Sequence, residues 1–272
     1  MVVVVRPNID EVERALKNDP DIACCIVEPT GGHFATYPIQ PLPFLQQLRE
    51  VTAKYGVLLI FDETITGFRV SKGGAAGKYN IDPDMSTFGK IVAGGMPGAA
   101  LAGKAKYMQM LERSGDPEWD RNVRVGQGGT FNANPPTAKA GIVGLTMIAE
   151  RPINEMADAM AARLKAGINE AFQRTEVSGF AYGIASMVNF IFGVDPKGEE
   201  YFEAPPLTYE EVRDEKSSKA AGFLTKAMLN HGVHVMGGRV CMVSSAHTAP
   251  QIDLTIDAFE KSLRDMRAEG LV

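Results

Sequence analysis

The 272-residue chain has little of the chemistry that marks a secreted or a metal-binding protein. It has three cysteines, of which Cys24 and Cys25 are adjacent in an apolar run and Cys241 lies far along the chain. This usage argues against a disulfide framework and predicts buried, reduced thiols. The four histidines lack the spacing of metal ligands, so we expect no metal site.

The chain also has no excess of basic residues and no long apolar run. It carries 28 Lys and Arg against 33 Asp and Glu, and without a basic cluster nothing predicts binding to nucleic acid or to an anionic membrane. The longest apolar runs, residues 2–5 and 57–61, are far shorter than the ~20 residues that span a bilayer. The opening MVVVVR lacks the features of a secretory signal. The sequence therefore predicts a cytoplasmic protein without nucleic-acid or membrane partners.

Apolar runs alternate with helix-like segments in the first part of the chain. The helix-like segments include residues 9–18, with Asn8 as a cap, and residues 44–55, which Gly56 should end. The strand-like runs cover residues 2–6, 22–27, 57–61, 86–88 and 98–102. Strands that are apolar on both faces and separated by helices imply a mostly parallel sheet covered on both sides. We therefore expect an α/β fold here.

The pattern changes near residue 150. Before it, residues 114–129 form a polar stretch that predicts an exposed loop, and residues 135–149 have a helical pattern. After it, the helix candidates are residues 153–175, 209–230 and 251–267, and the strand candidates are residues 187–192, 233–236 and 240–243. We predict a larger domain over residues 1–150 and a smaller α+β domain over residues 151–272.

Polar residues follow two of the strand-like runs, and ligands bind at the carboxyl ends of parallel strands. Asp62 and Glu63 come directly after VLLIF, and Lys90 follows STFG and precedes IVAGGM. A partly desolvated carboxylate needs a cationic partner, and an amine in apolar surroundings is a nucleophile toward carbonyls. Together they predict a Schiff-base site beside a cationic ring nitrogen. The alternatives are a turn-forming Asp62 and a solvated loop lysine.

Two arginines are weaker candidates for binding a substrate carboxylate. Arg69 lies in TGFR, and a structural or interface ion pair is the favoured alternative. Arg239 lies in GGRVCM, where recognition of a carboxylate and a solvated turn are equally supported.

Three long blocks of the chain resemble consecutive blocks of a known family. They read EPTGGHFATYPIQPLPFLQQLREVTAKYGVLLIFDETITGFR, GAAGKYNIDPDMSTFGKIVAGGMPGAALAGKAKYM and GGTFNANPPTAKAGIVGLTMI. They are similar to the class III aminotransferases, pyridoxal 5'-phosphate (PLP) enzymes of fold type I, and most of all to the glutamate-1-semialdehyde aminomutase branch. The terminal SSAHTAPQIDLTIDAFEKSL resembles the last helix of that branch. The resemblance covers nearly all of the chain.

The resemblance assigns roles to individual residues. Lys90 corresponds to the lysine that forms a Schiff base with the cofactor and moves the proton between the substrate Cα and the cofactor C4′. Asp62 corresponds to the carboxylate that keeps the pyridine nitrogen protonated. Thr130 corresponds to a residue that reaches the cofactor phosphate from the neighbouring subunit, helped by N–H groups of Gly129 or Thr130. Glu28 begins the EP block and is expected near the site. The glycines around Lys90 would let the backbone pass close to the cofactor.

Besides a minor change after the lysine block, where Ala93-Gly94-Gly95 replaces three glycines, the chain departs from the family pattern in two ways. Thr64 stands where the family usually has a valine that packs under the ring, which would loosen that contact. The family also has well over a hundred residues before the region matched here, including a helix start that holds the phosphate and an aromatic side chain that stacks on the ring. We therefore expect an N-terminally truncated fold type I domain.

These observations favour a shortened PLP-dependent aminotransferase. It would move an amino group from an amine or amino acid donor to a keto acid, aldehyde or ketone. An aminomutase of the glutamate-1-semialdehyde type and a non-catalytic relic of the family are the alternatives. Because the role of Thr130 requires a second chain, the resemblance also implies a homodimer or a higher homo-oligomer, with Phe131 and Asn132 as contact residues.

Overall fold

The computed structural model describes residues 2–30, 41–212, 214–237 and 239–272. The chain divides into two compact units. The first is built from Pro41–Phe68 and Lys72–Glu150 with the described residues before Thr30, and the second from Arg69–Ser71 and Arg151–Val272 with Thr30. That the first unit is a cofactor-binding domain stays a prediction.

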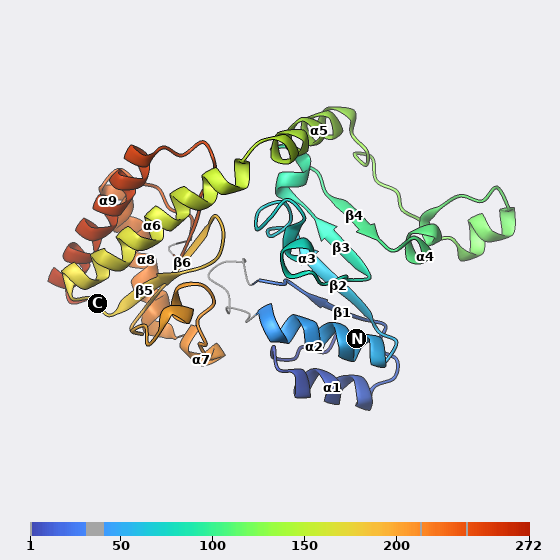
Figure 1. The fold of residues 1–272 in the computed structure, drawn as a ribbon, viewed down its shortest axis with the longest axis horizontal. Helices are drawn as coiled ribbons and strands as arrows, with labels where there is room; N and C mark the ends of the chain where they lie inside the picture. The colour runs from blue at the N-terminus through green and yellow to red at the C-terminus, as the bar shows by residue number, and fades with distance from the viewer. Residues whose placement is uncertain (1, 31–40, 213, 238) are drawn as a thin grey trace. The chain divides into compact units, whose positions relative to one another are not determined.

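The first unit is built on a mixed, mostly parallel sheet (Figure 1). Its strands, in spatial order, are β1 (Cys24–Val27), β2 (Leu58–Glu63), β3 (Met85–Phe88) and β4 (Ala100–Gly103). The first three are parallel, and β4 runs antiparallel to β3. In this register Asp62 pairs with Thr87, and Thr87 pairs with Leu101. The predicted α/β class is confirmed.

Local signals mark the start of α1 and the end of α2 in the first unit. The Asn8 side chain accepts hydrogen bonds from the N–H groups of Asp10 and Glu11 at 2.9 and 3.2 Å, so it caps α1 as expected. Gly56, with φ +68°, follows the end of α2. The helices are α1 (Ile9–Asn18), α2 (Pro41–Lys54), α3 (Gly74–Tyr79), α4 (Ala105–Met108) and α5 (Pro135–Glu150), with short turns η1 (Lys90–Ala93), η2 (Gln109–Leu111) and the π-helical η3 (Trp119–Val123).

The two faces of this sheet differ in burial. Leu59 and Phe61 are fully buried on the face that packs against the apolar sides of α1 and α2. On the opposite face Ile26 is 60% exposed and Leu101 is 39% exposed. A cover on this second face, which the apolar pattern predicts, is not found among the described residues. Asp62 lies on this second face, because it pairs through Thr87 with Leu101.

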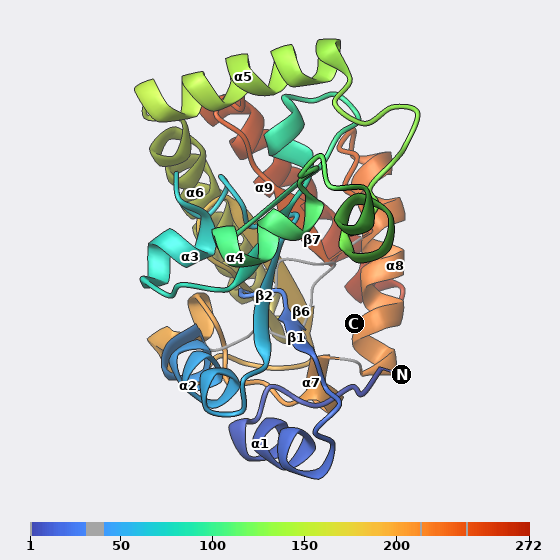
Figure 2. The ribbon, with the colours of Figure 1, turned by 90° about the vertical axis from the view of Figure 1, so that its right-hand side faces the viewer.

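The second unit is an α+β arrangement around an antiparallel sheet (Figure 2). The sheet has the order β5 (Gly179–Tyr182), β6 (Met187–Phe192), β7 (Val240–Met242). The helices are α6 (Ile153–Thr175), α7 (Tyr209–Val212), α8 (Glu215–Asn230) and α9 (Ala249–Ala268), with the short turn η4 (Glu199–Phe202). Alternate side chains of β6, Val188, Phe190 and Phe192, pack with α6, α8 and α9. Ile191 packs on the other face with Tyr201.

Several local predictions are wrong. Residues 2–6 and 233–236 are rich in valine but are not strands, because a strand forms only where a partner strand pairs with it. The predicted helix over residues 209–230 breaks between α7 and α8, where the Asp214 side chain accepts from the N–H of Ser217 at 2.8 Å and caps α8. Cys24 is exposed on the uncovered sheet face instead of buried.

No helix among the described residues is long and apolar enough to cross a bilayer. The cytoplasmic location stays a prediction.

Candidate active site

The sheet of the first unit brings the predicted polar groups to one edge. Strands β1, β2 and β3 are parallel, so their carboxyl ends meet at the same edge. The half-buried Glu28 follows β1, Asp62 lies near the end of β2, and Lys90 comes two residues after β3. Lys90 is close enough for its charge to act on Asp62. The structure therefore brings the predicted acid and lysine together.

Asp62 is held by its own turn and by the neighbouring strand. Its Oδ1 accepts a hydrogen bond from the N–H of Thr64 at 3.0 Å and another from the hydroxyl of Thr87 at 3.1 Å. Partial burial alone would raise the pKa of Asp62. Hydrogen bonds from the side chain and backbone of Thr64 and from Thr87, with the charge of Lys90, outweigh burial and lower the pKa below its usual value. Asp62 is therefore an ionised carboxylate at neutral pH.

Lys90 has an unusual backbone conformation. It opens η1 with φ +52°, a left-handed conformation that is uncommon for residues other than glycine and often marks a functional position. Its side chain is exposed, so the apolar surroundings expected from the sequence are not found within the described chain. The preceding Gly89 leaves room for Thr64, whose Cγ2 would lie 3.0 Å from a Cβ at that position.

Two glycines let η1 approach helix α5. Gly94 ends η1 with φ +61°, and a Cβ there would lie 2.2 Å from the carbonyl oxygen of Ala140 in α5. Across this contact, a Cβ on Gly141 would lie 2.5 Å from the carbonyl oxygen of Val92. Such distances do not occur for real side chains, so both positions require glycine. Gly94, in the Lys90 block, thus serves the packing of η1 against α5. That the glycines around Lys90 also let the backbone pass close to a cofactor stays a prediction.

Glu63, next to Asp62, organises the chain that follows β2. Its side chain is buried, with 1% of the residue exposed. It accepts hydrogen bonds from the Thr66 hydroxyl at 2.8 Å and from the N–H groups of Ala75 and Ala76 at 2.8 and 3.0 Å. Glu63 therefore ties the start of α3 to the end of β2, a role that the sequence did not indicate.

The residues predicted to bind the cofactor phosphate, Gly129 and Thr130, precede α5 in the chain. Thr130 is exposed in a turn before α5, where the N–H of Asn132 donates to the carbonyl oxygen of Gly129 at 3.0 Å. No hydrogen bond connects Thr130 with Asp62 or Lys90 in the part of the chain that the structure describes. Since the predicted role of Thr130 is toward a neighbouring subunit, a single chain leaves it untested.

The contacts of the two candidate arginines are structural, but they differ from the predicted alternatives: Arg69 donates to a hydroxyl and a carbonyl oxygen, and Arg239 is hydrogen-bonded instead of lying in a solvated turn. Arg69 donates to the hydroxyl of Ser186 at 2.9 Å and to the carbonyl oxygen of Val243 at 3.2 Å, all within the second unit. Arg239 donates to the carbonyl oxygen of Val212 at 2.6 Å. Both guanidinium groups thus fasten backbone segments of the second unit.

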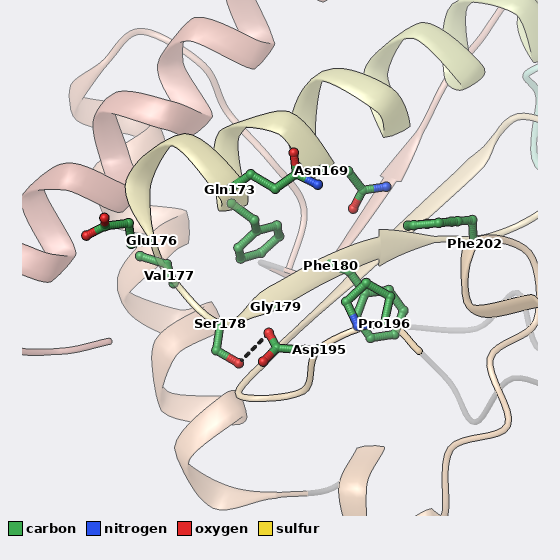
Figure 3. Close-up of a pocket in the computed structure, with 11 residues that line it drawn as sticks. Asn169, Gln173, Glu176, Val177, Ser178, Gly179, Phe180, Asp195, Pro196 and Phe202 are labelled. Carbon is green, nitrogen blue, oxygen red and sulfur yellow. Dashed lines mark hydrogen bonds between the residues drawn. The ribbon is translucent and has the colours of Figure 1, made fainter. Parts of the chain in front are cut away.

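A separate cavity of about 290 Å³ opens in the second unit, between α6 and β5 (Figure 3). The Ser178 hydroxyl and the Asp195 carboxylate at its wall are paired with each other at 3.0 Å. Asn169 is likewise engaged with the backbone of Ala181. None of the predicted site residues lines this cavity, so it is distinct from the candidate site.

Residues 5–204, most of the chain, match the protein family described as aminotransferase class-III. The chain belongs to the class III aminotransferases. It is 34% identical over 271 residues to glutamate-1-semialdehyde 2,1-aminomutase of Pyrobaculum calidifontis, a match that covers 98% of this chain and 57% of that protein. The corresponding protein of Caldicellulosiruptor saccharolyticus is 34% identical over 258 residues, or 93% of this chain and 56% of its own length.

Solved structures of two aminotransferases share the fold of this chain. An omega-transaminase from Sphaerobacter thermophilus superposes with a TM-score of 0.82 and 29% identity over 98% of this chain and 57% of its own. A β-phenylalanine aminotransferase from Variovorax paradoxus superposes with a TM-score of 0.76 and 28% identity over 98% of this chain and 58% of its own. This class III chain spans a little more than half the length of the relatives that it matches.

Class III enzymes use PLP, and the chemistry of the sheet edge fits one end of that cofactor. An ionised carboxylate, Asp62, suits a protonated pyridine nitrogen, and the amine of Lys90 suits an aldehyde. For the phosphate end, the sequence offers Gly129 and Thr130.

Proposed function

We propose that this chain carries the lysine and carboxylate of a PLP-dependent class III active site. The reaction would move an amino group from an amine or amino acid donor to a keto acid, aldehyde or ketone. One observation carries the proposal: an ionised Asp62, held by hydrogen bonds from Thr64 and Thr87, lies at the same sheet edge as Lys90, whose charge acts on it. The family match supports the assignment.

Each residue has a defined task in this proposal. When bound, PLP supplies an aldehyde that reacts with amines and a ring that withdraws electrons from the carbon being deprotonated. The Nζ of Lys90 would hold the aldehyde of the cofactor and, once displaced there by the substrate amine, would be free to move the proton at the substrate Cα. The carboxylate of Asp62 would keep the ring nitrogen protonated. Thr64 would pack under the ring, and Glu28 would lie near the site.

The proposed phosphate ligands call for a second copy of the chain. Gly129 and Thr130 would act across a subunit interface, so we propose at least a homodimer. The exposure of Phe131, at 83%, supports a contact surface beside this turn. Light scattering at working concentration should give a mass of two chains or more, and a monomer would contradict the proposal.

A second candidate function is an aminomutase that moves an amino group within one substrate. The identity of 34% to several glutamate-1-semialdehyde 2,1-aminomutases favours it. Supplying glutamate-1-semialdehyde and measuring 5-aminolevulinate separates this candidate from an aminotransferase, which would instead consume an external amine. Failure of both assays, without any specific cofactor attachment, would leave a non-catalytic member of the family.

The test of the proposed function is cofactor attachment to Lys90. The purified chain is mixed with PLP, reduced with borohydride and mapped by peptide mass spectrometry. We expect one stable pyridoxyl label on Lys90, no label at this position in Lys90→Ala, and unchanged labelling in Lys78→Ala, a matched exposed lysine of α3. Label spread over surface lysines, or equal incorporation into Lys90→Ala, would refute the proposed site.

A further inference from the structure

The carboxylate of Asp62 receives a hydrogen bond from the neighbouring strand. Thr87 pairs with Asp62 in the parallel register of β2 and β3, so both side chains stand on the same face of the sheet. The Thr87 hydroxyl donates to Oδ1 of Asp62 at 3.1 Å. The N–H of Thr64 donates to the same oxygen at 3.0 Å. One carboxylate oxygen is therefore held from two directions.

Thr87 is well suited to hold this oxygen in one place. It is half-buried within a strand, and its β-branched side chain has restricted rotation about χ1. Its backbone is fixed on both sides, because β3 pairs with β2 and with β4. The hydroxyl is thus placed by the sheet itself, whereas the N–H of Thr64 belongs to the turn after β2.

We propose that Thr87 is a positioning residue for Asp62. By holding Oδ1, the hydroxyl of Thr87 sets the plane of the carboxylate and so aims Oδ2 at the cationic group that Asp62 serves. This inference rests on the proposed function for the identity of that group, a protonated pyridine nitrogen. The hydrogen bond itself belongs to the chain alone and can be tested without the cofactor.

The hydrogen bond from Thr87 also affects the pKa of Asp62. A hydrogen bond donated to a carboxylate stabilises the ionised form and lowers the pKa. Removing the Thr87 hydroxyl should therefore raise the pKa of Asp62. The other groups that keep Asp62 ionised, Thr64 and the charge of Lys90, remain in such a variant, so the carboxylate should stay charged at neutral pH but lose its fixed orientation.

The primary test is a titration of Asp62 in the chain without cofactor. The chain is labelled with ¹³C at the aspartate carboxyl groups, and the Asp62 signal is assigned with Asp62→Asn. In Thr87→Val, which keeps the branched shape, we expect the midpoint of the Asp62 titration to move upward. Thr87→Ser should restore it, and Thr225→Val, which removes a hydroxyl from α8, should leave it unchanged.

A second readout is the affinity for PLP. We expect Thr87→Val to weaken binding about two- to tenfold, the size of one ordinary hydrogen bond, because the charge of Asp62 is kept and only its fixed orientation is lost. The borohydride label should remain on Lys90. If Thr87 had only a structural role, Thr87→Val would not raise the midpoint of the Asp62 titration, and Thr87→Ser would not restore it.

An Asp62 titration that is unchanged in folded Thr87→Val would overturn the inference. If Thr87→Val does not fold, Thr87→Ala and Thr87→Ser provide the same comparison of a missing and a retained hydroxyl. Failure of the proposed function is distinguishable, because it would appear as no label on Lys90 in the parent chain. The Asp62 titration would still decide whether Thr87 holds the carboxylate.

Discussion

Replacing Glu63 with alanine is expected to destabilise the first unit by about 3–5 kcal/mol. The substitution removes the acceptor for the Thr66 hydroxyl and for the N–H groups of Ala75 and Ala76. A buried donor left without an acceptor costs about 1–3 kcal/mol, and three such donors share this space. Water that enters the emptied site recovers part of the sum.

Amide hydrogen exchange at Ala75 and Ala76, together with urea unfolding, measures this effect. Glu63→Gln keeps the shape of the side chain but replaces one acceptor oxygen by a donor, so it should cause a smaller loss of the same sign. Glu50→Ala, at an exposed position of α2, is the matched control and should change the free energy of unfolding little. Unchanged protection of the two amides in Glu63→Ala would contradict the anchoring role.

Replacing Asp62 with asparagine is expected to weaken PLP binding about 10- to 100-fold. Asparagine is close to aspartate in shape, and its carbonyl oxygen can still accept from Thr64 and Thr87, but it carries no charge for a protonated ring nitrogen. A hydrogen bond to a charged group contributes about 1.5–3 kcal/mol, and 1.4 kcal/mol corresponds to tenfold in affinity. The loss should therefore exceed that of Thr87→Val.

Absorbance titration with PLP at constant pH gives the two affinities. Asp82→Asn is the matched control in the same unit, because the side chain of Asp82 is 83% exposed and its ion pair with Lys104 lies at the surface, where such pairs contribute little. Equal affinities for the parent chain and Asp62→Asn would show that Asp62 does not serve the ring nitrogen. The proposed function would then lose the observation that carries it.

Elements with strong local signals could be predicted from the sequence alone. The predicted helix over residues 153–175 and the predicted strand over residues 187–192 agree with α6 and β6. A long amphipathic pattern and a continuous apolar run specify such elements within one segment. Residues 2–6 and 233–236 have similar apolar character, yet they form no strand. A strand depends on a partner elsewhere in the chain, and that partner is not a local property.

The residues of the candidate site likewise fall into those that the sequence indicated and those that only the structure revealed. Asp62 and Lys90 could be found from their positions after apolar runs and from the resemblance to class III enzymes. Thr87 and Glu63 were missed as supporting residues, although both stand beside the residues that were found. The two polar residues in the STF run were the available signal for Thr87. Their meaning depends on the register between β2 and β3, which a single sequence does not give.

The α/β class and the proposed pair of Asp62 and Lys90 could be inferred from residue types and their spacing, and the family from the resemblance of long blocks of the sequence. The structure was needed to show that the Thr87 hydroxyl holds Asp62, that Lys90 takes a left-handed backbone conformation, and that Gly94 is needed for contact with α5. The physical reason is that register, backbone conformation and close packing arise from contacts between segments far apart in the chain, and no single segment encodes them.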